Sequence, residues 1–137
     1  MRINKVGPWV YYVTERSVML LSKDAGKWMY FFDNNDGFIA DICKKAVESG
    51  VVAEAKHSDD VRGVACFYVN GDDVDAHKKV IKFFLDNKMI PYTKSGKLKN
   101  ISFKFNVQTR AGEYGEEFKP QIYLEKFVDL TTGEWKI

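Results

Sequence analysis

Two segments of the chain repeat apolar residues at the three- and four-residue spacing of an amphipathic helix. The first follows the polar run 33–36, whose aspartates and asparagines suit a helix cap, and ends at Gly50. The second follows the polar run 70–73 and carries its lysines opposite the apolar side, until Pro91 ends the pattern. The sequence therefore predicts helices over residues 38–47 and 74–89.

The other apolar residues form short runs or alternate with polar residues, which is typical of strands. Residues 28–32 are an aromatic run after a predicted turn at 23–27, so we expect a central strand covered on both faces. Residues 93–100 are basic and indicate a flexible connection. The predicted strands cover residues 9–13, 18–21, 28–32, 51–56, 61–69, 101–107 and 121–130.

This order of elements predicts an α+β fold, a mainly antiparallel sheet with two main helices packed on one face. The 137 residues, 45% of them hydrophobic, are enough for one buried core, so we expect a single domain over residues 1–137.

The charge balance limits the partners of this chain. Its 21 basic and 19 acidic residues leave a net charge of +2, too small for binding duplex nucleic acid through overall charge.

No apolar run reaches the roughly 18 residues of a membrane span, and the first residues lack the apolar segment of a signal peptide. Cys43 and Cys66 lie in apolar patterns, as buried thiols do in a reducing compartment. We expect a soluble cytoplasmic protein without a membrane partner.

The common catalytic and metal-binding motifs are missing from the sequence. Two isolated histidines and two isolated cysteines lack the spacing of a zinc site. There is neither a glycine-rich phosphate loop nor a serine nucleophile elbow. We therefore expect no metal and no cofactor, and the sequence leaves open whether the protein is an enzyme.

The segment from Lys104 to Tyr114 most resembles a ligand site. On a strand over residues 101–107, Lys104 shares one face with Ser102, Asn106 and Gln108, which can line a pocket or be the solvated side of a sheet. The loop expected after this strand holds further groups that suit an anion or, alternatively, an ordinary solvated turn: Thr109, Arg110, Gly112 and Tyr114.

Short motifs across residues 26–114 carry a resemblance to a known family. They are Gly26-Lys-Trp-Met-Tyr-Phe-Phe32, Ser49-Gly50, Ala55-Lys56, Asp72-Asp-Val74, and the run from Lys104 through Thr109 to Gly112 and Tyr114. In their order they resemble the basophilic leukaemia expressed protein family, also known as phosphothreonine lyase domain proteins. The resemblance implies a curved antiparallel sheet backed by helices, similar to the cap-binding translation initiation factor, and a site region more than a function.

Lys56 matches the Ala-Lys motif of that family at the end of predicted strand 51–56. If this strand neighbours the one carrying Lys104, the two ammonium groups could converge on a dianion, and Arg62 could add a third positive charge. The alternative is a strand-end lysine that reaches water.

The resemblance also implies an elimination reaction with Lys56 or Lys104 as base and His57 as acid. In phosphothreonine lyases one residue separates the lysine from the histidine, whereas Lys56 and His57 are adjacent. On a regular strand the two side chains point to opposite faces, so only a bulge or bend would bring them together. His77 is expected to pack within the second helix's apolar stripe.

Cap binding holds a methylated base between two aromatic planes, so the tryptophans are candidates for stacking. Trp28 is expected in the core, whereas Trp9 and Trp135 could each line a cleft. The leading hypothesis is a binding module for a phosphorylated small molecule or nucleotide. The alternatives are a phosphothreonine lyase-like enzyme, and a protein-interaction or inhibitor module that contacts a protein partner through exposed aromatics and residues 94–99. The proposed ligand-binding residues are Lys56, Arg62, Lys104, Thr109, Arg110 and Tyr114.

Overall fold

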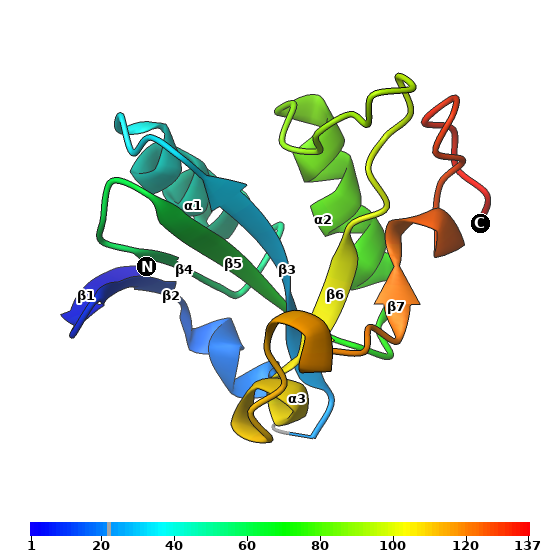
Figure 1. The fold of residues 1–137 in the computed structure, drawn as a ribbon. Helices are drawn as coiled ribbons and strands as arrows, with labels where there is room; N and C mark the ends of the chain where they lie inside the picture. Colours follow the sequence, from blue (N-terminus) through cyan, green and yellow to red (C-terminus); the bar gives the residue numbers. More distant parts are fainter. Residues whose placement is uncertain (22) are drawn as a thin grey trace.

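The computed structural model describes residues 1–21 and 23–137. They form a seven-stranded antiparallel sheet with strand order β1-β2-β4-β5-β3-β6-β7 (Figure 1). This confirms the predicted α+β class. The strands are β1 (Arg2–Val6), β2 (Trp9–Val13), β3 (Ala25–Phe32), β4 (Glu54–Ser58), β5 (Gly63–Asn70), β6 (Ser102–Phe105) and β7 (Ile122–Tyr123).

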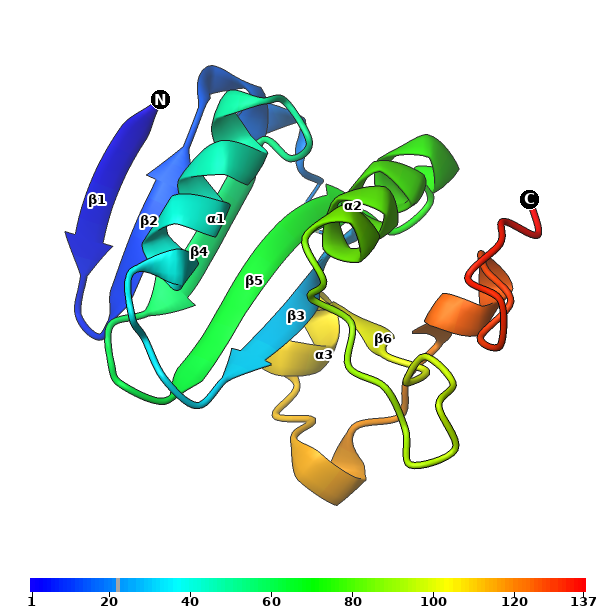
Figure 2. The same cartoon turned by 90° about the horizontal axis from the view of Figure 1, so that it is seen from above.

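Helices α1 (Phe38–Glu48) and α2 (Val74–Asp86) cover the same face of the sheet, as predicted (Figure 2). Each begins at one of the polar runs: the Phe38 N–H donates to the Asp36 carboxylate at 3.2 Å, and the Ala76 N–H to that of Asp73 at 3.1 Å. The short helix α3 (Asn106–Arg110) lies on the other side of the sheet (Figure 1). Three 3-10 turns complete the regular elements: η1 (Glu15–Met19), η2 (Gly115–Glu117) and η3 (Leu124–Lys126).

The hydrophobic core lies between the sheet and these two long helices. Trp28 is fully buried, and the rings of Phe103 and Phe127 lie 5.7 and 6.2 Å from its ring. Its indole Nε1 donates to Nδ1 of His77 at 3.0 Å, and Nε2 of His77 donates to the Gly71 carbonyl at 2.8 Å. The predicted core positions of Trp28 and His77 are therefore confirmed.

Strand β3 is an interior strand, as predicted, but only one of its faces is fully covered. Trp28 and Phe32 are buried beneath the helices, whereas Phe31 is 71% exposed on the opposite face. The strand also begins earlier than predicted, because Ala25, Gly26 and Lys27 belong to β3 and not to a turn.

The predicted strand 101–107 is wrong beyond Phe105. There the chain turns into α3, because the buried side chain of Gln108 folds back and accepts the Phe105 N–H at 3.2 Å. The amide of Gln108 then donates to the Lys119 carbonyl at 3.0 Å and to Glu113 at 3.2 Å. These contacts satisfy the polar groups of Gln108 in a helical turn and end the strand alternation.

Two further strand predictions are wrong. Residues 18–21 form no strand, since η1 occupies residues up to Met19 and the Leu21 N–H donates to the Asn70 side chain at 2.8 Å. In segment 121–130, only Ile122 and Tyr123 pair as a strand. The following residues turn inward at η3, so that Leu124, Phe127 and Val128 enter the core at helical spacing.

None of the helices in the described part of the chain combines the length and the apolar character needed to cross a membrane.

The pairing of β3 with β6 is short and close. Strand β3 pairs with β5 along all eight of its residues, but with β6 only at Gly26, Lys27 and Trp28. At Gly26 a Cβ would lie 2.5 Å from the Phe103 ring and 2.6 Å from the Lys104 carbonyl oxygen, so glycine permits the two strands to approach. Beyond Trp28 the strands diverge (Figure 1).

Candidate functional site

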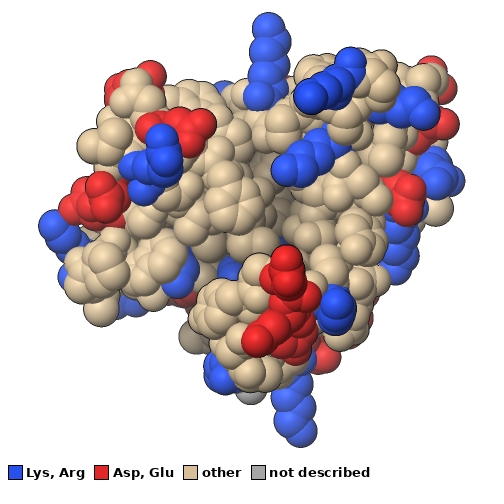
Figure 3. Space-filling view, in the orientation of Figure 1, with Lys and Arg blue, Asp and Glu red and all other residues tan. Residues whose placement is uncertain are grey.

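The sheet face opposite α1 and α2 holds a cavity of about 350 Å³. We call this cavity the lysine pocket, because three lysines from three strands line it. Figure 3 shows a hollow near the centre of the molecule in this view, with acidic side chains gathered on the surface below it. The residues that line the lysine pocket are Trp9, Lys27, Met29, Phe31, Lys56, Val64, Cys66, Lys104, Thr109, Tyr114, Gly115 and Phe118.

Strand register brings the three lysines together. Lys27 of β3 and Lys104 of β6 are direct cross-strand partners, and Lys56 of β4 is paired with Cys66 of β5, whose neighbour on β3 is Met29. Directly opposed side chains on one sheet face lie about 5 Å apart at their Cβ atoms. The sheet therefore places three ammonium groups on neighbouring rows of one face.

Lys27 is almost fully buried, and it is not among the site residues predicted from the sequence. Its side chain is 8% exposed, and its ammonium group donates to Oγ1 of Thr109 at 2.8 Å and to Oδ1 of Asn106 at 3.4 Å. Burial lowers the pKa of Lys27 to about 8. Cys66 acts in the opposite direction, and three cationic neighbours lower this pKa further: Lys56, Lys104 and Arg110.

Lys104 was predicted as a ligand-binding residue, and it lines the pocket. It is 6% exposed, and its Nζ lies 4.1 Å from the ring centre of Tyr114 and 5.2 Å from that of Phe118. Burial lowers its pKa, while Glu113 and Cys66 act in the opposite direction. The aromatic rings attract the ammonium group through their electron-rich faces without neutralising it.

Lys56 lines the opposite wall of the pocket, in the middle of β4 and not at a strand end. Its Nζ lies 3.8 Å from the ring centre of Trp9 and 5.5 Å from that of Tyr11. The strands of Lys56 and Lys104 are not neighbours, because β5 and β3 lie between them. The curved sheet nevertheless brings both side chains to one pocket.

No carboxylate within residues 1–21 and 23–137 forms an ion pair with these three lysines. The ion pairs that this part of the chain makes within 4.0 Å are Lys5–Asp59, Arg62–Asp33 and Lys82–Asp86. Three positive charges thus face one cavity with hydroxyl, amide and aromatic partners.

Thr109 and Tyr114 line the lysine pocket, whereas Arg110 is not among its lining residues, and Thr109 and Arg110 belong to helix α3 and not to a loop. The Thr109 hydroxyl contacts the ammonium group of Lys27, and the charge of Arg110 acts on the same group. Tyr114 is 60% exposed and stands at the mouth of the pocket.

Arg62 lies outside the lysine pocket. It is exposed in the turn before β5 and pairs with Asp33 at 3.4 Å. Its predicted role in ligand binding is therefore not supported by its position, because β5 begins one residue later and the arginine projects from the end of the sheet.

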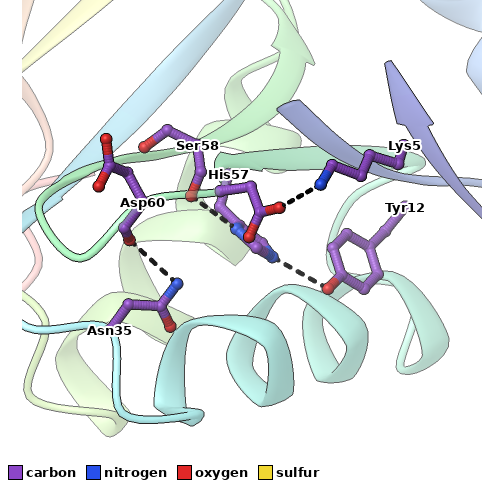
Figure 4. Close-up of polar contacts among 7 residues, drawn as sticks. Lys5, Tyr12, Asn35, His57, Ser58 and Asp60 are labelled. Atoms are coloured by element: carbon purple, nitrogen blue, oxygen red, sulfur yellow. Dashed lines mark hydrogen bonds and ion pairs between the residues drawn. The ribbon is translucent and has the colours of Figure 1, made fainter. Parts of the chain in front are cut away.

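His57 points away from the lysine pocket into the helix-covered face of the sheet (Figure 4). It is 4% exposed; its Nδ1 donates to the Ser58 carbonyl at 3.0 Å, so Nε2 accepts from the Tyr12 hydroxyl, also at 3.0 Å. Strand β4 is regular at this point, so Lys56 and His57 occupy opposite faces. The structure does not form the lysine–histidine pair that elimination would require.

The tryptophans form no aromatic sandwich in the described residues. Trp9 lines the pocket, but its ring faces the ammonium group of Lys56. Trp135 lies beside Lys78 of α2, 5.4 Å from Nζ to ring centre, and outside the pocket.

Seven residues that line the pocket were missed from the sequence: Lys27, Met29, Phe31, Val64, Cys66, Gly115 and Phe118. A signal for three of them was present, because Lys27, Met29 and Phe31 alternate with Trp28 and Tyr30, which face the core. Extending the strand to residue 25 would have placed Lys27 on the same face as Lys104.

No protein-family model matches this chain, and a search of curated proteins finds no protein with similar sequence. The resemblance to the basophilic leukaemia expressed protein family stays a prediction.

Proposed function

We propose that the lysine pocket binds a phosphorylated small molecule or nucleotide. The observation that carries this proposal is the convergence of Lys27, Lys56 and Lys104 on one cavity without a carboxylate partner among the described residues. Like charges that share a poorly solvated site repel one another. A bound dianion would attract all of them and so offset this repulsion. A phosphate group also offers several acceptor oxygens for ammonium donors.

The walls of the pocket favour a ligand that has an apolar or flat part beside its phosphate. Trp9, Tyr114 and Phe118 present aromatic rings, and Met29 and Val64 add apolar surface. The volume of about 350 Å³ falls within the range of about 300–1,000 Å³ that is usual for small-molecule sites. A nucleotide or a phosphorylated aromatic compound combines both features. Cytoplasm, where phosphorylated metabolites occur and free thiols persist, is the compartment that we propose.

Calorimetric titration with inorganic phosphate and a panel of nucleotides tests this function. We expect binding that weakens with added salt, and at least about tenfold weaker binding in Lys56→Met and Lys104→Met, because each removes one charge from the pocket. Lys82→Met is the matched control, since Lys82 is paired with Asp86 on the exposed side of α2. If the wild type binds no phosphorylated compound at millimolar concentration, the proposal is wrong.

A further inference from the structure

Lys27 differs from the other two lysines of the pocket in what its nitrogen contacts. The ammonium groups of Lys56 and Lys104 face aromatic rings, at 3.8 Å from Trp9 and 4.1 Å from Tyr114, and such contacts favour a cation. The nearest polar partners of Lys27 are a hydroxyl and an amide oxygen. Both can accept a hydrogen bond from a neutral amine as well as from an ammonium group.

The charged groups around Lys27 also favour its neutral form. Lys104 approaches from β6, Lys56 from β4 and Arg110 from α3, and all three disfavour a further positive charge. Two groups on β5 favour the charged form instead: the Cys66 thiol, and the ring of Tyr68, whose centre lies 5.9 Å from Nζ. Burial is the largest influence and lowers the pKa to about 8. At pH 7 roughly one tenth of Lys27 therefore carries a free electron pair.

We propose that Lys27 forms a reversible imine with a phosphorylated aldehyde, whose phosphate group is held by Lys56 and Lys104. This inference rests on the proposed function and adds a chemical class of ligand to it. A desolvated lysine beside other cations is the usual arrangement for a lysine that attacks a carbonyl group. The structure adds access, because Lys27 lines the cavity in which the carbonyl carbon would lie.

The reaction balances without an oxidant or a reductant. The free electron pair of Nζ attacks the carbonyl carbon, a C–N bond forms, and the carbonyl electron pair moves to oxygen, which takes one proton from nitrogen. The second nitrogen proton and the hydroxyl group then leave as water, and the C=N bond forms. The Thr109 hydroxyl lies 2.8 Å from Nζ and can pass the proton from nitrogen to oxygen.

Two probes that differ only in the oxidation state of one carbon atom distinguish imine formation from non-covalent binding. Pyridoxal 5′-phosphate carries an aldehyde, whereas pyridoxine 5′-phosphate carries an alcohol at the same carbon and cannot form an imine. The full-length protein is incubated with each probe, reduced with borohydride, digested and mapped by mass spectrometry. We expect Lys27 to be labelled by the aldehyde at least about tenfold faster than the exposed Lys82, with a rate that levels off above a pH of about 8.

Variants assign the steps of this reaction. Lys27→Met should abolish the rapidly formed adduct, and Thr109→Val should slow labelling of Lys27 by about three- to tenfold, because the hydroxyl that passes the proton is lost. Lys82→Met should label Lys27 at the wild-type rate. Thermal melting of each variant in buffer shows whether it is folded.

Each outcome decides between the two proposals. An adduct concentrated on Lys27 supports the imine. If pyridoxine 5′-phosphate binds but the aldehyde labels Lys27 no faster than Lys82, the imine is wrong and the phosphate-binding function stands. If neither compound binds at millimolar concentration and Lys27 is not labelled preferentially, this ligand class is excluded and the nucleotide titration alone decides the function.

Discussion

Lys27 loses most of its hydration when the chain folds. In the folded protein this residue is 8% exposed, and its ammonium group lies near the charges of Lys56 and Lys104. In the unfolded chain this group has the ordinary pKa of 10.5, whereas in the folded protein the pKa is about 8. The folded state thus binds this proton less tightly than the unfolded state does, and a charged Lys27 lowers the free energy of unfolding.

Replacing Lys27 with Met should stabilise the protein at neutral pH by on the order of 1–2 kcal/mol, because the substitution removes a desolvated charge. The gain should shrink as the pH rises from about 8 to 10.5, because wild-type Lys27 loses its proton over this range and the penalty disappears. Urea unfolding of both proteins at the two ends of this range measures the gain.

The two proteins must be compared with each other at each pH, because other groups lower the free energy of unfolding as the pH rises. Burial raises the pKa of Cys43 and of Tyr12 to about 12, so the unfolded chain loses these protons first and both proteins become less stable in alkali. An advantage of Lys27→Met that is constant across the pH range would contradict the assigned cause.

Four of the twelve residues that line the pocket were predicted from the sequence as ligand-binding residues, but their contacts could not be predicted. Lys56, Lys104, Thr109 and Tyr114 were chosen because cationic and hydroxyl-bearing residues near strand ends suit an anion, and all four line the pocket. Lys27 was missed because residues 23–27 contain the polar and glycine residues of a turn. The cross-strand pairing that buries Lys27 depends on β6, which lies about 75 residues away in sequence.

At the scale of the elements, the approach of β6 to β3 decides whether the pocket exists. Gly26 lies opposite Phe105, and its missing side chain leaves room for the ring of Phe103 and the carbonyl of Lys104. The next residue pair along this contact is Lys27 and Lys104. The spacing of the two strands therefore sets the distance between two of the three ammonium groups.

Gly26→Ala should destabilise the protein by about 2–4 kcal/mol, because the new methyl group would overlap backbone and a buried ring. It should also weaken phosphate binding in the fraction that still folds. Chemical unfolding and calorimetric titration measure the two effects.

Gly112→Ala is the control for Gly26→Ala. At Gly112 the added Cβ would meet nothing within 4 Å, although the φ of +80° makes alanine unfavourable there by about 1 kcal/mol. Equal losses of stability in the two variants would show that the close strand approach is not the limiting feature.

The two main helices could be predicted because their signals are local. Asp73 caps α2, Asp36 accepts the Phe38 N–H at the start of α1, and the apolar stripe of each helix needs only an adjacent sheet. The segments after residue 105 could not, because their paths depend on distant partners. Gln108 bonds to the carbonyl of Lys119, and the Leu124 N–H bonds to the Ile101 carbonyl at 2.8 Å.

At the scale of the whole molecule, the lysine pocket spans a narrow junction in the sheet. Lys56 belongs to the part formed by β1, β2, β4, β5 and β3, whereas Lys104, Thr109 and Tyr114 belong to the segment that joins β3 through three residue pairs. A ligand held by both Lys56 and Lys104 would connect the two parts.

Binding of pyridoxine 5′-phosphate should therefore slow amide hydrogen exchange in residues 102–118 by at least about threefold, because local opening of this segment must break the new contacts. Exchange in β1, at the far edge of the sheet, should be unchanged and is the internal control. Mass spectrometry of exchanged peptides measures both. Equal protection of β1 and residues 102–118 would argue against a ligand in this pocket.

Cys66 lies on the floor of the lysine pocket, 2% exposed and within the field of its three lysines. The other thiol, Cys43, belongs to α1 and is buried on the opposite face of the sheet. A small alkylating reagent can reach Cys66 only by entering the cavity, so any guest that fills the cavity shields this sulfur and leaves Cys43 unaffected. The alkylation rate of Cys66 therefore measures how much of the pocket is occupied, and that of Cys43 serves as the internal reference.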